Sequence, residues 1–396
     1  MSYRSLPLAL CGLAAFGLAA CDSADGPAAM PETATGAFDA ALFAGAEQLI
    51  TVSNQANANA NDRAVRFRNP DALARKAAFF RQNRYPVTSF QSALFEEGSS
   101  TFFGTFDVGT AESPQGRLAM FDRRGNQIAF DDGTLVSPKG LSAFSGDEGV
   151  GIVFVADVGQ SGGFGYFFDD GMLAPTGVIN EPGAPNWDFH FDSNGIGFVF
   201  GAGTDGFVSV YGDFGDPIDR FQVLDANGNP ATNNHGITYD AESGTLIVSD
   251  VGLAGSDDDG AINVIDYNPF EDGRIEPNLE GGPEEPFVLP GPNANQPIQA
   301  RATYAGANTM LGNPVDIAGS GSDLFVAEKA ANGGMMMRFA GVLSATGVQD
   351  VAPAATSPLE GAESVDVYDR DAIGGGGAPT DIVVRTGEEA LRRWGR

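Results

Sequence analysis

Short apolar runs that end in a polar residue recur along most of the chain. Seven of them share one arrangement, in which a loop and then a second apolar run follow the first; these first runs are residues 48–54, 101–107, 151–157, 195–201, 244–250, 322–328 and 380–386. Several, such as 152–156 and 324–327, are apolar without a break, which is typical of strands covered on both faces. Most are themselves preceded by another short strand-like segment. The pattern therefore predicts repeated antiparallel units of three or four strands each.

The spacing of these units points to one architecture. They lie roughly 45–55 residues apart, except for one longer interval. A small sheet with two apolar faces cannot bury both by itself, whereas a radial stack buries each face against its neighbour. We therefore expect an all-β fold, a β-propeller with seven blades favoured over six or eight. Two stacked β-sandwich domains are the alternative, which explains the strands but not their recurring order.

The chain divides into three parts, the last of which contains an insertion. Residues 1–20 are expected to be a signal peptide, residues 21–37 a flexible tether, and residues 38–396 the propeller. Residues 269–305 are rich in Pro, Gly, Asn and Glu and are predicted to form an inserted loop. Residues 70–82 are the one segment with a helical pattern, and a short segment near 38–46 could supply the strand that closes the ring.

The amino terminus carries an export signal. Arg4 is followed by an apolar run that is too short to span a bilayer, and small residues then lead to Cys21. The stretch Leu18-Ala19-Ala20-Cys21 resembles the bacterial lipobox, which implies lipid attachment at Cys21 and a location in the cell envelope, facing the periplasm or the cell surface. An ordinary signal peptide is the alternative. After cleavage Cys21 is the last remaining cysteine, so a disulfide within the mature chain is excluded.

The charge of the chain limits its partners. The formal net charge is −30, from 52 acidic and 22 basic residues, and three of the basic residues are Lys. A nucleic-acid partner needs a basic face and is therefore not expected. Electrostatic docking on anionic lipid is disfavoured for the same reason. We expect a monomer that contacts the membrane through the lipid on Cys21, with a protein or glycan as a further partner.

Two phrases carry a family resemblance. Residues 235–250 (HGITYDAESGTLIVSD) and 313–328 (NPVDIAGSGSDLFVAE) resemble the NHL and YncE-like propeller repeats, and residues 138–157 are a looser copy. The resemblance covers about half of the chain and is specific for architecture rather than activity. It implies that the loop ends of the innermost strands meet at an axial channel.

The same resemblance points to binding residues at the channel mouth. The residues that end successive apolar runs would occupy equivalent positions there, and Asn234, His235 and Asp316 begin innermost strands; the run-ending residues are Asn54, Asp107, Asp157, Asp250 and Glu328. A ring of carboxylates could hold calcium through oxygen ligands. The alternative is structural, because an Asp at such a position accepts hydrogen bonds from nearby backbone N–H groups.

Catalytic candidates are few. His190 and His235 both fall near the starts of innermost strands, where a neutral imidazole could act as a base or a ligand, although a hydrogen-bonded structural role is the alternative. Related propellers include gluconolactonase-like and paraoxonase-like hydrolases that hold calcium, and virginiamycin-lyase-type enzymes with a catalytic His. The Asn-Gly motif of the calcium-binding hydrolases would correspond to residues 234–236, where His235 intervenes. No Gly-x-Ser-x-Gly or phosphate-binding loop is present.

These observations favour a binding function. We expect a lipid-anchored envelope propeller that binds a protein, glycan or small molecule at its channel mouth. A calcium-dependent hydrolase or lyase that uses His235 with Asp250, Asp316 or Glu328 is the alternative. A structural role in a larger surface assembly is the third hypothesis.

Overall fold

The structure of the protein is a computed structural model that describes most of the propeller. It covers residues 48–369 except for short intervals, which are 55–64, 70, 79–86, 95–99, 111, 122–125, 146–150, 161, 170–171, 181–185, 192–197, 204, 213–216, 241–242, 254–257 and 278–287. The signal sequence with Cys21, the segment 38–46 and the apolar run 380–386 lie outside the described residues. No helix among the described residues is long and apolar enough to cross a membrane.

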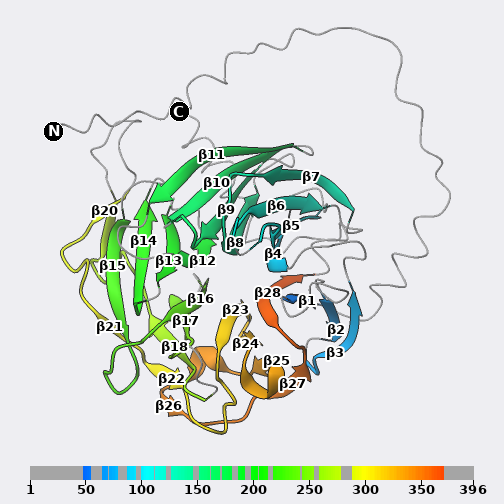
Figure 1. The fold of residues 1–396 in the computed structure, drawn as a ribbon. Coiled ribbons are helices and arrows are strands. Elements are labelled where there is room, and N and C mark those ends of the chain that lie inside the picture. Colours follow the sequence, from blue (N-terminus) through cyan, green and yellow to red (C-terminus); the bar gives the residue numbers. More distant parts are fainter. Residues whose placement is uncertain are drawn as a thin grey trace, which may run out of the picture.

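Within these residues, six sheets of four or five strands surround a common centre, as Figure 1 shows. Sheet 1 has the order β28-β1-β2-β3, with bounds Ala362–Asp369, Gln48–Asn54, Val65–Asn69 and Ala74–Ala78. Sheet 2 runs from β4 to β7, with bounds Val87–Leu94, Ser100–Asp107, Gly116–Phe121 and Gln127–Asp132. Sheet 3 runs from β8 to β11, with bounds Pro138–Ser145, Gly151–Asp157, Gly162–Asp169 and Met172–Asn180.

The other three sheets follow the same plan with additions at their outer edges. Sheet 4 contains β12 to β15 and β21, with bounds Asn186–Phe191, Phe198–Gly203, Phe207–Gly212, Pro217–Leu224 and Ile298–Gln299. Sheet 5 contains β16, β17, β18, β22 and β26, with bounds Asn234–Asp240, Thr245–Asp250, Ala261–Asp266, Ala302–Tyr304 and Gly347–Gln349. Sheet 6 contains β23, β24, β25 and β27, with bounds Pro314–Ser320, Asp323–Glu328, Met335–Phe339 and Ala355–Pro358.

The ring is closed by the last described strand. β28 lies beside β1 in an antiparallel pair, so the two ends of the described chain share sheet 1. The innermost strands β4, β8, β12, β16, β23 and β28 each contact the next, and β28 contacts β4. The sequence pattern assigned β28 to a seventh unit, whereas it completes the first. The favoured count of seven is therefore wrong for the described residues, which form six sheets.

Alternate residues of a strand face the two sheets that flank its own sheet, which explains the unbroken apolar runs. In β24, Leu324 and Val326 pack into a core shared with sheet 5. Phe325 and Ala327 pack into a core shared with sheet 1. Fully burying side chains of this size contributes about 1.5–3 kcal/mol each. Each sheet is thus stabilised chiefly by the two sheets beside it, as the propeller interpretation requires.

Aromatic rings fill the spaces between sheets where these diverge. Phe103 of sheet 2 meets Phe168 of sheet 3 with ring centroids 4.8 Å apart. The contacts Phe221–Tyr267 and Tyr304–Phe339 repeat this between later sheets, each at 5.3 Å. Tilted and edge-on ring pairs of this kind add to the energy of burial.

The structure differs locally from the sequence predictions at residues 70–82 and 269–305. The helix predicted for residues 70–82 is wrong: residues 71–73 form a turn and Ala74–Ala78 is strand β3, which pairs with β2. Helix propensity is a weak preference, and here the edge of a four-stranded sheet overrides it. The segment 269–305 predicted as an inserted loop is a loop only in part, because it includes β21, which extends sheet 4, and β22, which belongs to sheet 5. The segment also carries the small sheet of β19 (Ile275–Pro277) and β20 (Val288–Pro290). Two short 3₁₀ helices lie in connections: Ala331–Gly333 joins β24 to β25, and Val342–Ser344 lies between β25 and β26.

The innermost strands approach one another closely near the channel. A Cβ at Gly236 of β16 would lie 2.7 Å from Asp316 Cα of β23, which is closer than real Cβ atoms come to backbone. By contrast, a Cβ at Gly319, further along β23, would have its nearest neighbour at 3.7 Å. Only a residue without a side chain fits at position 236, because the obstacle is the neighbouring backbone.

We predict that Gly236→Ala lowers the free energy of unfolding by about 1–3 kcal/mol, the usual cost of overpacking. Gly319→Ala is the matched control on the adjacent innermost strand and is expected to change stability by less than about 1 kcal/mol. Urea denaturation of both variants measures the difference. Equal stability of the two variants would contradict the close approach of β16 and β23.

Candidate functional site

Every innermost strand has a register irregularity near its first residues. The pairing skips Thr88 in β4, Trp187 in β12 and Val315 in β23. It also skips Lys139 with Gly140, His235 with Gly236, and Glu363. A bulge of this kind re-aims a side chain, and bulges are common at the rims of barrels and beside active sites. The repeat therefore presents one extra residue per sheet at the same end of the channel.

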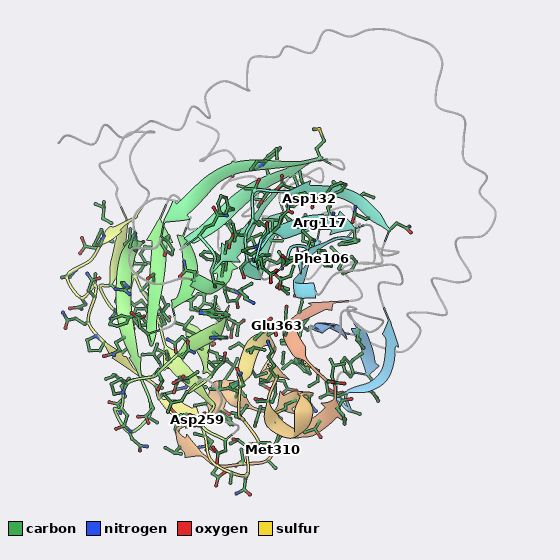
Figure 2. All side chains as sticks on the ribbon, viewed as in Figure 1. Phe106, Arg117, Asp132, Asp259, Met310 and Glu363 are labelled. Carbon is green, nitrogen blue, oxygen red and sulfur yellow. The ribbon has the colours of Figure 1, made fainter. Side chains whose placement is uncertain are left out.

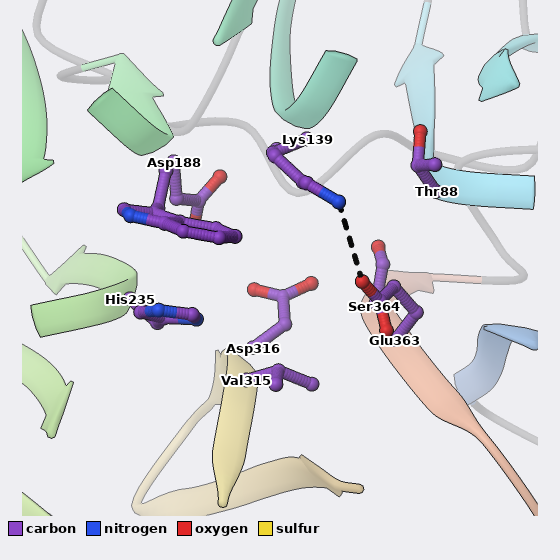
Figure 3. A pocket seen from close by; sticks show the side chains of 10 residues that line it. Thr88, Lys139, Asp188, His235, Val315, Asp316, Glu363 and Ser364 are labelled. Atoms are coloured by element: carbon purple, nitrogen blue, oxygen red, sulfur yellow. Dashed lines mark ion pairs between the residues drawn. The ribbon is translucent and has the colours of Figure 1, made fainter. Parts of the chain in front are cut away.

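These residues line one pocket of about 280 Å³, part of which is open to solvent. All six sheets contribute, and the lining residues are Thr88, Lys139, Gly140, Trp187, Asp188, His235, Val315, Asp316, Glu363 and Ser364. Figure 2 places Glu363 near the centre of the ring, whereas Asp259 and Met310 lie at its periphery. Figure 3 shows the Asp316 carboxylate between His235 and Lys139.

Two lysines converge on one glutamate at the pocket. Lys329 Nζ lies 2.5 Å from Glu363 Oε2. Lys139 Nζ lies 3.9 Å from Glu363 Oε1, the ion pair that is dashed in Figure 3. The second distance exceeds a hydrogen bond, so Lys139 is held by charge and not by a hydrogen bond to Glu363. The Glu363 side chain is 6% exposed and that of Lys139 is 16% exposed. Solvent therefore screens the attraction between Lys139 and Glu363 less than it screens a surface ion pair.

An aromatic stack forms the opposite wall. The rings of Trp187 and His235 are parallel within 16°, with centroids 4.0 Å apart, and Lys139 Nζ lies 5.5 Å from the Trp187 ring centroid. Burial, followed by the charges of Lys139 and Lys329, lowers the pKa of His235 to about 3. The imidazole is consequently neutral at neutral pH. His235 is 8% exposed, and its Nε2 makes no hydrogen bond within the described residues.

Two buried aspartates join neighbouring innermost strands. Asp188 Oδ2 accepts a hydrogen bond of 3.1 Å from the backbone N–H of Ile237 in the next sheet. Asp316 Oδ2 accepts one of 2.7 Å from Val365 in its next sheet. Burial raises the pKa of Asp316 to about 7, and burial together with the charge of Asp316 raises the pKa of Asp188 well above its usual range. The two carboxyl groups together therefore retain a proton at neutral pH.

Three of the carboxylates proposed for the channel mouth end strands β9, β17 and β24 and bind backbone N–H groups of the neighbouring loops instead. Asp157 accepts hydrogen bonds from the backbone N–H groups of Val136, Ser137 and Gly159 at 2.7–3.0 Å. Asp250 accepts three such bonds, and Glu328 accepts four. None of the three lines the pocket. Their geometry is that of the structural alternative, in which a carboxylate holds the loop that leads into an innermost strand.

Some of the remaining candidate residues line the pocket and others do not. His235 and Asp316 line the pocket, as their positions in the repeat suggested. His190 lies three residues beyond Trp187 in β12 and outside the pocket lining, and burial lowers its pKa to about 4. Asn234 donates a hydrogen bond of 3.4 Å to the carbonyl of Phe207. Asp107 ends β5, and Asn54 ends β1 opposite Ala362.

The donors proposed for calcium do not converge. Among the residues that the structure describes, no group of three or more His, Cys, Asp or Glu side chains is arranged to hold a metal ion. Asp250 and Glu328 direct their oxygens at backbone N–H groups, which compete for the lone pairs that a cation would need.

Several pocket residues were missed in the sequence, namely Thr88, Lys139, Trp187, Asp188, Val315, Glu363 and Ser364. They occupy the second and third positions of the repeat phrase, as in Pro138-Lys139-Gly140-Leu141 and Pro314-Val315-Asp316-Ile317. The second position varies in chemistry from copy to copy. This variable position in an otherwise regular phrase was the signal in the sequence that could have indicated the pocket residues, because residues with a shared structural task recur from copy to copy.

Comparison with known proteins supports the fold. No protein-family model matches the chain, and no curated protein matches its sequence. A structure from Bacteroides fragilis NCTC 9343, named provisionally as a 6-phosphogluconolactonase, is similar with a TM-score of 0.50 and 9% identity, over 82% of this chain and 99% of that chain. A functionally unknown protein from Desulfotomaculum acetoxidans DSM 771 is similar with a TM-score of 0.50 and 10% identity, over 82% and 99%. Identities this low show the fold alone, so the resemblance to NHL and YncE-like repeats is supported at the level of the propeller.

We predict that Asp250→Ala lowers the free energy of unfolding by about 2–3 kcal/mol, because backbone N–H groups in the loop lose their acceptor. The loss should be the same with calcium and with a chelator, as read by thermal unfolding. Glu112→Ala, at an exposed carboxylate, is the control and should be close to neutral. A calcium-dependent stabilisation that disappears in Asp250→Ala would contradict the structural role.

Proposed function

We propose that the protein is an exported, lipid-anchored propeller that binds a small polar molecule in the pocket at its channel mouth. The proposal for export and anchoring rests on residues 1–21, where the apolar run and the lipobox-like stretch end at Cys21. The proposal for binding rests on the bulges: all six sheets re-aim residues into one pocket, which regular strand pairing does not require.

The size and chemistry of the pocket favour a small molecule over a protein or a long glycan. The space of about 280 Å³ includes open solvent, so the enclosed part of the pocket accommodates only a small group. It offers an ammonium group, carboxyl groups, hydroxyl groups and an aromatic stack within one space. His235 Nε2 supplies a buried polar atom that lacks a partner in the described residues, and a ligand would satisfy it.

The chain contains a natural probe for this binding. It has two tryptophans, Trp187 in the pocket and Trp394 outside the described residues. In Trp394→Phe, all indole fluorescence comes from the pocket wall. We expect saturable changes in that fluorescence on titration with one or more members of a panel of sugars, sugar acids, hydroxy acids and amino acids.

Histidine variants in the same background separate pocket binding from general effects. His235→Ala should weaken binding about tenfold, since a lost ring contact and hydrogen bond cost about 1–1.5 kcal/mol. His190→Ala is the matched control and should bind as the parent does. If no compound alters the fluorescence of the folded protein, or if both histidine variants weaken binding equally, the proposal fails.

Hydrolysis of a cyclic ester is the second candidate function. The observation that favours it is the pair Asp188 and Asp316, which retains a proton at neutral pH inside the pocket and beside a neutral His235. A protonated and an ionised carboxyl group can serve as general acid and general base. Calcium is not needed for this route, in contrast to the lactonase-like alternative drawn from the sequence.

A test uses D-glucono-1,5-lactone as the substrate in the presence of a chelator. If the protein is a hydrolase of this kind, Asp316→Asn should lower the rate by about 10²-fold or more, while Glu112→Gln should not change it. Proton release followed with a pH indicator measures the rate. A wild-type rate equal to the uncatalysed rate would remove this candidate and leave binding as the function.

A further inference from the structure

We propose that the ligand of this pocket carries a single carboxylate group, which binds against the ammonium group of Lys139. This inference rests on the proposed binding function and specifies its ligand. It begins from the distribution of lysine in the chain. The protein has a net charge of −30 and three lysines, yet Lys139 lines the pocket and Lys329 bonds to a residue that lines it.

The local charges leave one positive charge to be balanced. Glu363 contacts both lysines, but it bonds closely to Lys329, at 2.5 Å, and stays 3.9 Å from Lys139. When Asp188 and Asp316 are both protonated, the two ammonium groups and one carboxylate sum to one positive charge, whereas an ionised Asp316 cancels it. A partly buried ammonium group gains more from a charged hydrogen-bond acceptor than an exposed one does, because the surrounding protein screens charge poorly. A monoanion meets this need.

The walls of the pocket fit an oxyanion beside Lys139. His235 is neutral, so its ring can donate a hydrogen bond from one nitrogen, and its Nε2 has no partner within the described residues. Trp187 stacks on His235, and Lys139 Nζ lies 5.5 Å from the centroid of the Trp187 indole. Figure 3 shows that Lys139 and His235 border the same space, with Asp316 between them.

The aspartates restrict the charge that the pocket accepts. An ionised Asp316 would repel an anion, whereas a protonated one would not, and its pKa is raised to about 7 by burial. A phosphate dianion would place a second negative charge near Asp316 and Glu363, which a single spare ammonium group cannot balance. A carboxylate is therefore favoured over a phosphate.

The same geometry predicts the direction of the pH dependence. Binding of an anion raises the pKa of Asp316 further, so the complex takes up a proton and affinity rises as the pH falls through neutrality. The charged and titratable groups that face the bound carboxylate come from five sheets, and they are Lys139, Asp188, His235, Asp316, Lys329 and Glu363, with Asp366 acting on Asp316. Burial raises the pKa of Asp316 to about 7, so this carboxyl group changes its charge near neutral pH.

The test compares carboxylates with their amides in the Trp394→Phe background. The probes are acetate, L-lactate, D-gluconate and D-glucuronate, each paired with its uncharged amide, and inorganic phosphate. We expect the best carboxylate to bind at least about tenfold more tightly than its amide, as a charge-assisted hydrogen bond implies. Lys139→Met should reduce that ratio to about one, and Lys76→Met, on the outer strand β3, should preserve it.

A second measurement isolates Asp316. The best carboxylate should bind more tightly at about pH 6 than at about pH 8, and Asp316→Asn should remove this difference. Equal affinities of acid and amide, or tighter binding of phosphate than of every carboxylate, would overturn the inference and leave small-molecule binding intact. If neither series changes the Trp187 fluorescence, the proposed binding function fails as well.

Discussion

The structure depends on how the innermost strands are held to one another around the channel. Each has a hydrogen-bonded neighbour on one side only, in its own sheet, so its other edge must be satisfied across the gap between sheets. Asp188 and Asp316 do this by accepting backbone N–H groups of Ile237 and Val365. Between β4 and β28 the link is instead a hydrogen bond of 3.1 Å between the hydroxyl groups of Ser89 and Ser364. Buried carboxylates carry a desolvation cost, which these hydrogen bonds offset in part.

The same contacts create the pocket. All six innermost strands leave their regular pairing near the start, and in β12 and β23 the residue after the skipped position is the aspartate that reaches the next strand. Glycine at positions 140 and 236 makes room for the aspartates of the neighbouring strands. The scaffold therefore requires the third residue of each repeat phrase to be small or to bridge strands. The second residue is free to vary, which allows Thr, Lys, Trp, His, Val and Glu to meet in one space without loss of the fold.

The sequence predicted the architecture well because burial on both faces of a strand leaves a direct pattern. The runs within β9, β17 and β24 are apolar over four or five residues, and in β17 and β24 alternate residues enter two different cores. The number of sheets was harder to predict from the sequence. Residues 362–369 look like the start of another unit, and nothing local shows that they pair with β1, more than 300 residues away.

The site was predicted only in part, for a related reason. Asp157, Asp250 and Glu328 stand out in the sequence because they recur at one position, and that recurrence reflects a shared structural task in each loop. Lys139 and Glu363 do not recur, and their proximity depends on ring closure through β28. His235 and Asp316 were found because they belong to the two clearest copies of the repeat phrase. The pKa values of the pocket groups follow from burial, which sequence spacing does not report.

A crystal structure that resolves side-chain orientation at the channel tests the central claim most directly. The account predicts six innermost strands, each with a bulge near its start, and six side chains around one pocket, from Thr88, Lys139, Trp187, His235, Val315 and Glu363. It also predicts that Asp188 and Asp316 bridge to the following strands. Innermost strands in unbroken register, with these side chains divided between separate blade interiors, would contradict it.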